Sequence, residues 1–467
     1  MWDEKYDVVV VGSGFAGLAA ALEAREAGAT VAVMDKMRVP GGNSTICGGL
    51  VAAAGSPLQA AEGIDDSPER MARDMLRAGL DLNHPELVRI VAEQSTPTLM
   101  WTIDKLGDTY KKNLNHLGGH SVPRTYNTAN TSGSGIIRPM LSLCREMDIP
   151  IRMKTLLTEV IRTPEGVVEG VVVRDGYLFP NMESGRPLRI HARRAVVLAT
   201  GGFSQDVDFR TIQNPVLDHT IESTNQPGAT AESLIAALRV GATPLHLSCI
   251  QLGPWASCDE EGFGVGSMFS MLAGFPYGIL VDARTGKRFV NELSDRRLWV
   301  DAMLNKHRFP VAITDHTGVR YASTLDKCLK RGVVKEYASI ESLAEANCIN
   351  VARLLDTVRR YNASVESGRD ADFGKPLQED LQPIDHPPYY AIRLTPKVHH
   401  CMGGVQIDET ARVIDINTHR PINGLFADGE FTGGIHGASR LGSAAIIDCL
   451  VFGRIAGRNA AGCPHRG

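Results

Sequence analysis

The sequence predicts an α/β fold with two domains, and three observations support this prediction. A glycine-rich loop joins a buried strand to a helix near the N-terminus, and another glycine-rich loop follows a strand near the C-terminus. The chain has 467 residues, which is more than one ordinary hydrophobic core accommodates. We therefore expect the two ends of the chain to build one domain and the middle to form a second.

The N-terminal strand is expected at Tyr6–Val11, a β-branched run typical of a strand buried on both faces. The glycine-rich segment 12–17 follows it and leads into an Ala/Leu-rich helix that ends near Gly28. A second apolar strand, Thr30–Met34, ends at Asp35. This succession of strand, loop, helix and strand is the βαβ unit of a Rossmann-like domain.

Each glycine of the loop has a reason to be there. Gly12 permits the tight turn, Gly14 lets a pyrophosphate approach the helix N-terminus, and Gly17 allows the helix to pack closely on the strand. Asp35 stands where a carboxylate takes ribose hydroxyl groups. The segment therefore predicts a bound dinucleotide.

Three later stretches favour FAD over NAD as that dinucleotide. The segment 39–55, "VPGGNSTICGGLVAAAG", is a second glycine-rich loop soon after the acid. An apolar strand, Ala195–Ala199, ends in the turn 200–202. Another strand ends at residues 428–430 and is followed by a glycine-rich loop and a helix beginning near Leu441. This wide spacing is typical of FAD-binding folds, in which both chain ends meet on one flavin.

Eight motifs carry a resemblance to a known family. They are "GSGFAG", "GGNST", "GGHSVPR", "ATGGF", "STNQPGAT", "RFVNELSDR", "VHHCMGG" and "GEFTGGIHGASRLG". On these motifs the chain resembles the fumarate reductase/succinate dehydrogenase flavoprotein family, in particular its soluble flavocytochrome c and urocanate reductase branch. The resemblance implies an FAD-binding domain from residues 1–247 and 399–467. An inserted α+β capping domain is expected at 248–398, with substrate between the two domains.

The resemblance and the loop spacing together give a set of expected cofactor contacts. These are Gly12, Gly14, Ala16, Gly17, Asp35, Lys36, Gly42, Asn43, Ser44, Thr200, Gly201, His400, Glu430, Arg440, Ser443 and Ala445. The branch with covalent flavin has a histidine in the loop matching "GGNST", where this chain has Asn43, Ser44 and Thr45. We therefore expect FAD to be bound noncovalently, and we expect no metal.

The resemblance implies reduction of the C=C bond of an α,β-unsaturated carboxylate, with hydride from flavin N5. The arginine of N-E-x-x-x-R is the family's proton donor, and in "NELSDRR" that position is Arg296. His399 and Arg440 match the residues that hold the substrate carboxylate. Both can bind the carboxylate more strongly as charge develops on it, which is electrostatic catalysis.

An arginine acid needs a relay that returns its proton, because its own pKa exceeds about 12. Relatives use a glutamate and a second arginine, and a gap-free count places these positions at Leu272 and Phe275. The alternative proton carriers considered are Glu260, Glu261, Asp295 and Tyr277. The relay is therefore open at the level of sequence.

The expected substrate differs from fumarate at its far end. Fumarate reductases hold the second carboxylate with a histidine and a threonine, and this chain has Gly253 and Met271 at those positions. Trp255 follows in the same motif. We therefore expect a monocarboxylate with a neutral or aromatic tail, contacted by Trp255, Met271 and Tyr126. The apolar neighbours of this segment are alternatively capping-domain core.

Three residues of "GGHSVPR" and its surroundings leave two interpretations open. His120 either supports its loop or reaches the substrate, and loop support is favoured. Arg124 and Tyr126 are candidates to line the pocket.

Cys401 is interpreted as a small side chain with no redox role, because no resolving cysteine is nearby in sequence.

Two other functions fit the same motifs. One is a dehydrogenase or oxidase acting on a saturated acid, an amino acid or a ketosteroid. The other is a flavoprotein subunit of an electron-transfer complex. The sequence shows no haem-attachment motif, iron–sulfur cysteine set or second nucleotide fingerprint, so we expect an external electron donor, either a protein or a reduced flavin.

Composition excludes other classes. A net charge of −4 without a basic stripe predicts no nucleic-acid partner. No apolar run reaches the length of a membrane span. The nine cysteines form no C-x-x-C pair and fit a reducing compartment, so a cytoplasmic location is expected.

Overall fold

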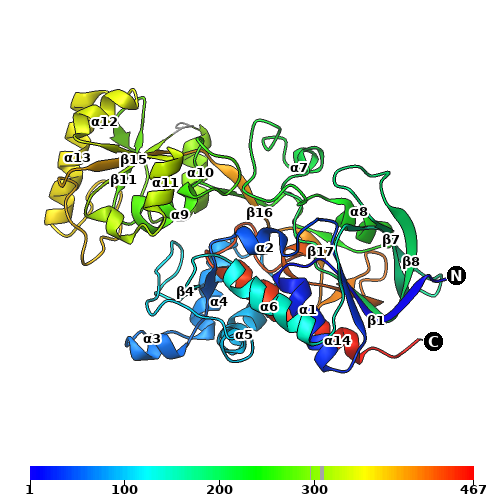
Figure 1. Cartoon of the computed structure of the whole chain (residues 1–467). Helices are drawn as coiled ribbons and strands as arrows, with labels where there is room; N and C mark the ends of the chain where they lie inside the picture. The colour runs from blue at the N-terminus through cyan, green and yellow to red at the C-terminus, as the bar shows by residue number, and fades with distance from the viewer. Residues whose placement is uncertain (295, 306–309, 467) are drawn as a thin grey trace. The chain divides into compact units, whose positions relative to one another are not determined.

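The computed structural model describes residues 1–294, 296–305 and 310–466. The described chain divides into two compact units (Figure 1). Unit 1 comprises residues 1–218, 226–251 and 400–467, and unit 2 comprises residues 219–225 and 252–399. Within this described part, no helix combines the length and the apolar character that a bilayer-spanning segment needs.

Unit 1 is built on an eight-stranded mixed sheet. The strands β1 and β8 lie side by side at its centre and run parallel. Around them the order is β18-β19-β8-β1-β2-β5, while β7 pairs with β8, and β6 with β7. The strands of this sheet are β1 Glu4–Val11, β2 Val31–Met34, β5 Ile151–Arg152, β6 Thr155–Arg162, β7 Val168–Asp175, β8 Arg186–Leu198, β18 Arg412–Ile414 and β19 Pro421–Ala427.

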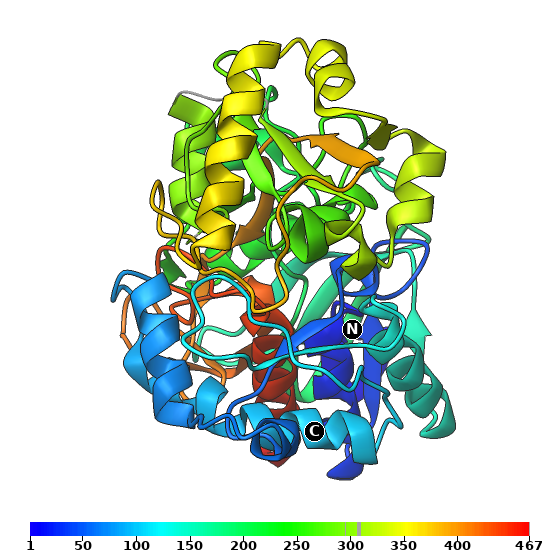
Figure 2. The ribbon, with the colours of Figure 1, turned by 90° about the vertical axis from the view of Figure 1, so that its left-hand side faces the viewer.

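Two helices from opposite ends of the chain pack together beside this sheet (Figures 1 and 2). They are α1, Phe15–Glu26, and α14, Ala444–Gly462. A Cβ at Gly453 would lie 2.5 Å from the carbonyl oxygen of Ala16, and one at Gly457 would lie 2.2 Å from that of Ala20. The two glycines allow the helix backbones to approach closely, which brings the C-terminal helix against the N-terminal βαβ unit.

The remaining elements of unit 1 are short strands and helices. The paired strands β3 and β4 form a small antiparallel ribbon, and β20, β17 and β9 form a three-stranded sheet. The bounds are β3 Leu50–Ala52, β4 Thr125–Asn127, β9 Pro244–Leu245, β17 Gly404–Gln406, β20 Thr432–Gly433, α2 Gly42–Ile46, α3 Pro57–Ala61, α4 Pro68–Ala78, α5 Pro85–Asp104, α6 Ser134–Glu146, α7 Val207–Gln213 and α8 Glu232–Arg239. The strands β10, Ile250–Gly253, and β16, Lys397–Cys401, are where the chain passes between the units.

Unit 2 has a five-stranded sheet of order β12-β11-β13-β15-β14 with helices on both faces. Successive residues of β11 alternate between two core clusters, with Ile279 and Val281 in one and Leu280 in the other. This is the period-two pattern of a strand buried on both faces. The strands are β11 Ile279–Asp282, β12 Lys287–Arg288, β13 Val311–Asp315, β14 Val334–Tyr337 and β15 Tyr389–Arg393.

The helices of unit 2 divide between those two clusters. Helices α12 and α13 cover one face of the sheet and supply Leu343 and Leu354 to its core. The other face is covered by α9, α10 and α11. The bounds are α9 Gly266–Phe269, α10 Arg296–Asn305, α11 Leu325–Arg331, α12 Ile340–Ala346 and α13 Val351–Glu366, and α9 continues into a π-helical turn at Ser270–Gly274. The predicted fold class, an FAD-binding α/β domain with an inserted α+β domain, is confirmed.

Candidate active site

A cavity lies in unit 1 at the carboxyl ends of its parallel strands. Its walls come from the loop after β1, the end of β2 with the loop that follows, the turn after β8 and the segment after β19. Of the predicted cofactor contacts, those that line it are Gly12, Gly14, Ala16, Asp35, Lys36, Gly42, Asn43, Ser44, Thr200, Gly201 and Glu430. Eleven of the sixteen predicted cofactor contacts are therefore gathered around one cavity.

The glycines of the first loop are required by their surroundings. Gly12 has a φ of +112°, and a Cβ there would lie 2.2 Å from the carbonyl oxygen of Ala199. A Cβ at Gly17 would lie 2.0 Å from the carbonyl oxygen of Gly12. Any side chain at either position would break the contact between α1 and the strands on which it packs.

Asp35 forms part of the cavity wall through three hydrogen bonds. The amide and the hydroxyl of Ser13 donate to Asp35 Oδ2 over 3.1 and 2.5 Å, and the amide of Met37 donates to Oδ1 over 2.8 Å. Beside it, Lys36 donates to Glu232 over 2.8 Å and to the hydroxyl of Thr230. These bonds fix the carboxylate at the end of β2, where a ribose-binding acid is expected.

Asp428 is the residue of this cavity that sequence reasoning missed. It is fully buried, and neither of its carboxyl oxygens has a hydrogen-bond partner among the described residues. Burial raises its pKa well above the usual range. A buried polar group without a partner is costly, and a ligand that carries hydroxyl groups would satisfy this one. The cavity therefore fits FAD, whose ribityl chain is a polyol.

Replacing Asp428 with alanine is expected to weaken FAD binding up to about 10-fold, since a hydrogen bond of a neutral group contributes about 0.5–1.5 kcal/mol. The same change removes an unsatisfied buried group from the apoprotein, so the melting temperature of the apoprotein should stay level or rise. Fluorescence titration of apoprotein with FAD and thermal unfolding without FAD measure the two effects. Asp65→Ala, at an exposed carboxylate, is the control. Unchanged FAD affinity in Asp428→Ala would exclude this role.

Glu430 lines the cavity and is partly buried, and Arg440 is buried close enough to it for their charges to interact. Burial raises the pKa of Glu430 to about 7, and burial lowers the pKa of Arg440 to about 10. Glu430 Oε1 accepts from the amide of Cys401 over 2.9 Å and lies 3.5 Å from His400 Nδ1. Arg440 thus remains cationic at neutral pH, which suits the carboxylate-binding role expected of it.

The loop after Arg440 differs from the expectation. The helix expected near Leu441 begins at Ala444, because Ser443 adopts a left-handed φ of +57°. Gln251 Nε2 donates to Ser439 Oγ over 2.9 Å and to the carbonyl oxygen of Arg440 over 3.1 Å. The predicted contacts Gly17, His400, Arg440, Ser443 and Ala445 are not among the residues that line the cavity in the described chain.

His120 supports this loop from behind. The guanidinium of Arg124 donates to His120 Nδ1 over 3.0 Å, and His120 Nε2 lies 2.7 Å from the carbonyl oxygen of Gly442. Since arginine can only donate, His120 is neutral with its proton on Nε2, and it donates to Gly442. Burial lowers the pKa of His120 to about 3, in agreement with this state. Loop support, the favoured interpretation of His120, fits these contacts.

The polar groups of Arg124 and Tyr126 form ion pairs and hydrogen bonds with other residues of unit 1. Arg124 is fully buried and pairs with Asp66 over 2.8 Å and with Asp74 over 2.6 Å. The hydroxyl of Tyr126 donates to Ser56 Oγ over 2.9 Å. These contacts give both residues a structural role, and a role for Tyr126 in substrate binding remains a prediction.

Unit 2 brings Arg296 and His399 to the same tryptophan. The guanidinium carbon of Arg296 lies 4.6 Å from the ring centroid of Trp255, and the ring of His399 meets Trp255 edge-on at 5.0 Å. Phe263 stacks on His399 at 6.1 Å. Thr224 Oγ1 lies 2.7 Å from His399 Nδ1. The same hydroxyl donates to the carbonyl oxygen of Val398 over 3.3 Å, so this threonine ties the His399 ring to the strand that carries it.

The motif that contains Arg296 is anchored by Glu292. This carboxylate is fully buried and accepts from the amide of Leu280 over 2.9 Å and from Arg288 over 2.9 and 2.7 Å. Arg288 also pairs with Asp370 over 2.9 Å. Glu292 therefore fixes the turn before α10, and Arg296 is the first residue of that helix. The neighbouring Arg297 is exposed.

The candidates for the proton relay make contacts elsewhere, are exposed, or lie outside the described residues. Glu260 accepts from the amides of Val265 and Gly266 at the start of α9, over 2.9 and 2.7 Å. Tyr277 stacks on Tyr321 with centroids 4.2 Å apart. Glu261 is exposed, Phe275 is buried against Trp299, and Met271 and Leu272 are partly buried. Asp295 lies outside the described residues. Phe269 and Phe275 belong to the core of unit 2, as the alternative interpretation of these aromatics held.

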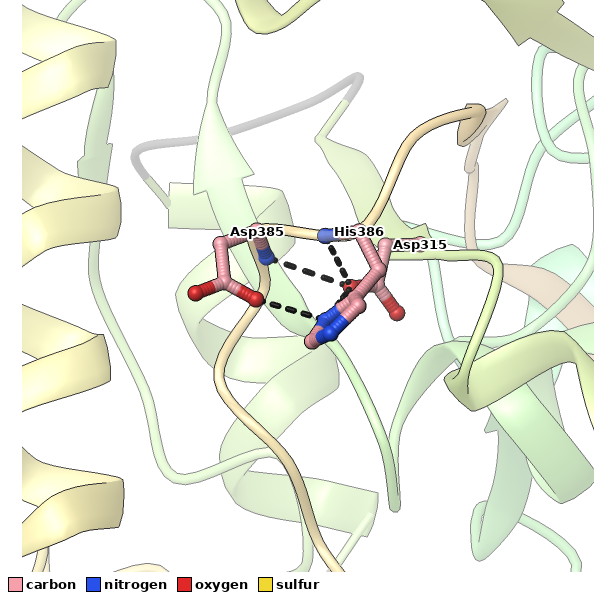
Figure 3. A group of neighbouring side chains, drawn as sticks. All are labelled: Asp315, Asp385 and His386. Carbon is pink, nitrogen blue, oxygen red and sulfur yellow. Dashed lines mark hydrogen bonds and ion pairs between the residues drawn. The ribbon is translucent and has the colours of Figure 1, made fainter.

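Asp315, Asp385 and His386 form a cluster with metal-ligand chemistry in unit 2 (Figure 3). However, Asp315 already accepts hydrogen bonds from the amides of Thr317, Gly318, Asp385 and His386 and from the hydroxyl of Thr317. Its carboxylate ties two chain segments together. The cluster is therefore a structural clamp, and nothing in it points to an ion.

Comparison with known proteins decides the family. The model of the FAD binding domain family matches residues 7–446. An acrylate reductase flavoprotein subunit from Shewanella woodyi is 44% identical, over 98% of this chain and 91% of the relative. The chain belongs to the fumarate reductase-like flavoproteins. As a flavoprotein of this group, it is an oxidoreductase acting on CH–CH bonds with FAD as cofactor.

Two further relatives of this flavoprotein agree. A cytochrome-linked fumarate reductase from Shewanella frigidimarina is 35% identical, over 97% of this chain and 77% of the relative. The solved open conformation of a flavocytochrome c3 fumarate reductase superposes with a TM-score of 0.80 at 34% identity, covering 99% of this chain and 79% of that one. The predicted family is confirmed.

Proposed function

We propose that this flavoprotein reduces the C=C bond of a small α,β-unsaturated monocarboxylate. The observation that carries the proposal is an arrangement in unit 2, where Arg296 and His399 both contact the ring of Trp255. The likeness to an acrylate reductase subunit over nearly the whole chain supports a monocarboxylate as the substrate.

Two residues are proposed to bind the substrate carboxylate, and a third is proposed to transfer a proton. FAD, when bound, supplies the hydride that is added to one alkene carbon. Negative charge then develops on the substrate carboxylate, which His399 and Arg440 bind more strongly than in the ground state. Arg296 gives its proton to the other alkene carbon. The cation–π contact with Trp255 holds the guanidinium in one place, which general acid catalysis requires.

The cofactor is proposed to be noncovalent. Asn43 and Ser44 line the cavity, and both side chains already hold the backbone around them. The amide of Gln226 donates to Asn43 Oδ1 over 2.8 Å, and the amide of Phe15 donates to Ser44 Oγ over 3.0 Å. Neither side chain is a nucleophile of the kind that links flavin covalently in relatives.

The electrons are proposed to come from a separate carrier, a protein or a reduced flavin. The relative from Shewanella woodyi is itself named a subunit, which fits a partner that delivers electrons.

Fumarate is expected to be a poor substrate. Gly253 offers no side chain to a second carboxylate, and the neighbouring side chain is the indole of Trp255. Burying an unpaired carboxylate costs several kcal/mol, and at about 1.4 kcal/mol per tenfold this lowers kcat/KM by about 100-fold or more.

A flavin reoxidation screen tests this function. The holoenzyme is photoreduced without oxygen, candidate acids are added, and the return of the oxidised flavin absorbance is followed. Acrylate and other enoates with one carboxylate should reoxidise the flavin, and fumarate should do so about 100-fold less efficiently. Efficient turnover of fumarate alone, or of no enoate while saturated acids reduce the oxidised flavin, would contradict the proposal.

A further inference from the structure

We propose that Trp255 is the residue that sets substrate size in this flavoprotein, by filling the space beside Gly253 at the far end of the substrate site. The inference rests on the proposed function and deepens it, because it restricts the substrate to short enoates such as acrylate. It depends on three features of unit 2: the contact of Trp255 with Gly253, its unpartnered indole nitrogen, and its position between Arg296 and His399.

The first feature is steric. A Cβ at Gly253 would lie 2.9 Å from Cζ2 and 3.0 Å from Cε2 of the Trp255 ring. Real Cβ atoms essentially never approach a neighbour below 3.0 Å, so even alanine at this position would push the indole. Glycine is therefore needed for the ring to lie where it does. In turn, the ring occupies the volume that a side chain of residue 253 would take.

The second feature is an unused donor. Trp255 is only 4% exposed, and its Nε1 has no hydrogen-bond partner among the described residues. Buried indole N–H groups usually find an acceptor. The other buried tryptophan of the same core, Trp299, follows this rule and donates to the carbonyl oxygen of Asn291 over 2.6 Å. The unpaired N–H of Trp255 indicates an acceptor that is supplied by a ligand.

The third feature is the pair of side chains that contact Trp255. Arg296 lies over its ring at 4.6 Å, and His399 meets its edge at 5.0 Å. In the proposed function, Arg296 transfers the proton and His399 binds the substrate carboxylate. A wall that touches both groups lies within reach of a substrate held by them. Apart from its indole N–H, which can donate to a carboxylate beside His399, this wall is apolar and uncharged. Such a wall accepts a vinyl group and excludes a second carboxylate or an aryl ring.

Truncation of Trp255 is expected to change kcat/KM in opposite directions for long and short substrates. Trp255→Ala removes the wall, so cinnamate should gain kcat/KM while acrylate loses it through poorer placement of Arg296. Changes in a hydrophobic pocket shift selectivity by about 10- to 200-fold, and we expect the ratio of cinnamate to acrylate to rise by at least 10-fold. Fumarate should remain poor, because truncation adds no cation for its second carboxylate.

The experiment measures kcat and KM for acrylate, cinnamate and fumarate in wild type and four variants. Trp255→Phe keeps the ring without the N–H, so it should keep the preference for acrylate with a raised KM. Gly253→Ala should shift the preference in the same direction as Trp255→Ala, because the new methyl group displaces the indole. Val334→Ala truncates a buried residue of the same core cluster and should lower stability without changing the preference.

The outcomes separate this inference from the proposed function. If wild type reduces acrylate but the cinnamate-to-acrylate ratio is the same in all variants, Trp255 does not set substrate size. The same conclusion follows if Val334→Ala shifts the ratio as much as Trp255→Ala does. If wild type reduces none of the enoates, the proposed function itself fails. A misfolded Trp255→Ala is recognised by loss of the cooperative urea unfolding transition in the fluorescence of Trp299, which lies in the same core, and Gly253→Ala then decides.

Discussion

Replacement of Arg296 with glutamine is expected to lower the rate of acrylate reduction by about 10³-fold, within the range that general acid catalysis contributes. Glutamine keeps a planar polar group above Trp255 but has no cationic proton to give. The affinity for acrylate should change far less, because carboxylate binding is assigned to His399 and Arg440 in the proposed function. Single-turnover reoxidation of the photoreduced holoenzyme, followed over a series of acrylate concentrations, separates the rate from the affinity.

Arg297 provides the matched control for this variant. It is the next residue of α10, it is exposed, and it lies 3.8 Å from Asp301. Arg297→Gln removes the same charge from the same helix turn and should reduce acrylate at nearly the wild-type rate. If both variants lose activity equally, or if Arg296→Gln stays within a few-fold of wild type, Arg296 is not the acid.

Glu292→Ala is expected to destabilise unit 2 by about 3 kcal/mol or more, the loss typical of breaking a buried ion pair. The change removes one of the two carboxylate partners of Arg288 and, at the same time, the acceptor of the Leu280 amide. Glu292→Gln should cost less, because its amide oxygen can still accept from one donor. Urea unfolding followed by tryptophan fluorescence in a background with Trp2 and Trp101 replaced by phenylalanine measures the free energy, since the remaining Trp255 and Trp299 both lie in unit 2.

An exposed ion pair of the same unit is the control for Glu292. Asp356 and Arg359 pair over 3.2 Å on the surface of α13. Asp356→Ala should change the free energy of unfolding by less than about 1 kcal/mol, as exposed pairs do. A loss in Glu292→Ala no greater than this would show that the buried network does not anchor the motif.

Local patterns were sufficient to predict the elements around the dinucleotide site. The β-branched run at Tyr6–Val11 and the apolar run at Thr30–Met34 became β1 and β2, within two residues at each end. Both signals depend only on neighbouring residues. The start of α14 was wrong by three residues, because the left-handed Ser443 is held by contacts with Thr125 and the loop of His120. Sequence spacing contains no information about such long-range contacts.

The candidate site was predictable where a motif names its own residues. Gly12, Gly14 and Asp35 line one cavity, whereas Gly17 serves the packing of the helix on the loop. Asp428 was missed, although an acid at the carboxyl end of a parallel strand is itself a signal for a ligand site. The contact of Trp255 with Arg296 and His399 joins residues that are far apart in the chain, and only the fold of unit 2 shows it.

The most direct measurement of the central claim is a crystal structure of the holoenzyme with propionate, the saturated product of acrylate. The account predicts that His399 and Arg440 hold the propionate carboxylate and that a guanidinium nitrogen of Arg296 lies within about 3.5 Å of a substrate carbon, the separation of reacting groups. An Arg296 side chain directed to solvent, or propionate bound away from His399, would contradict the account.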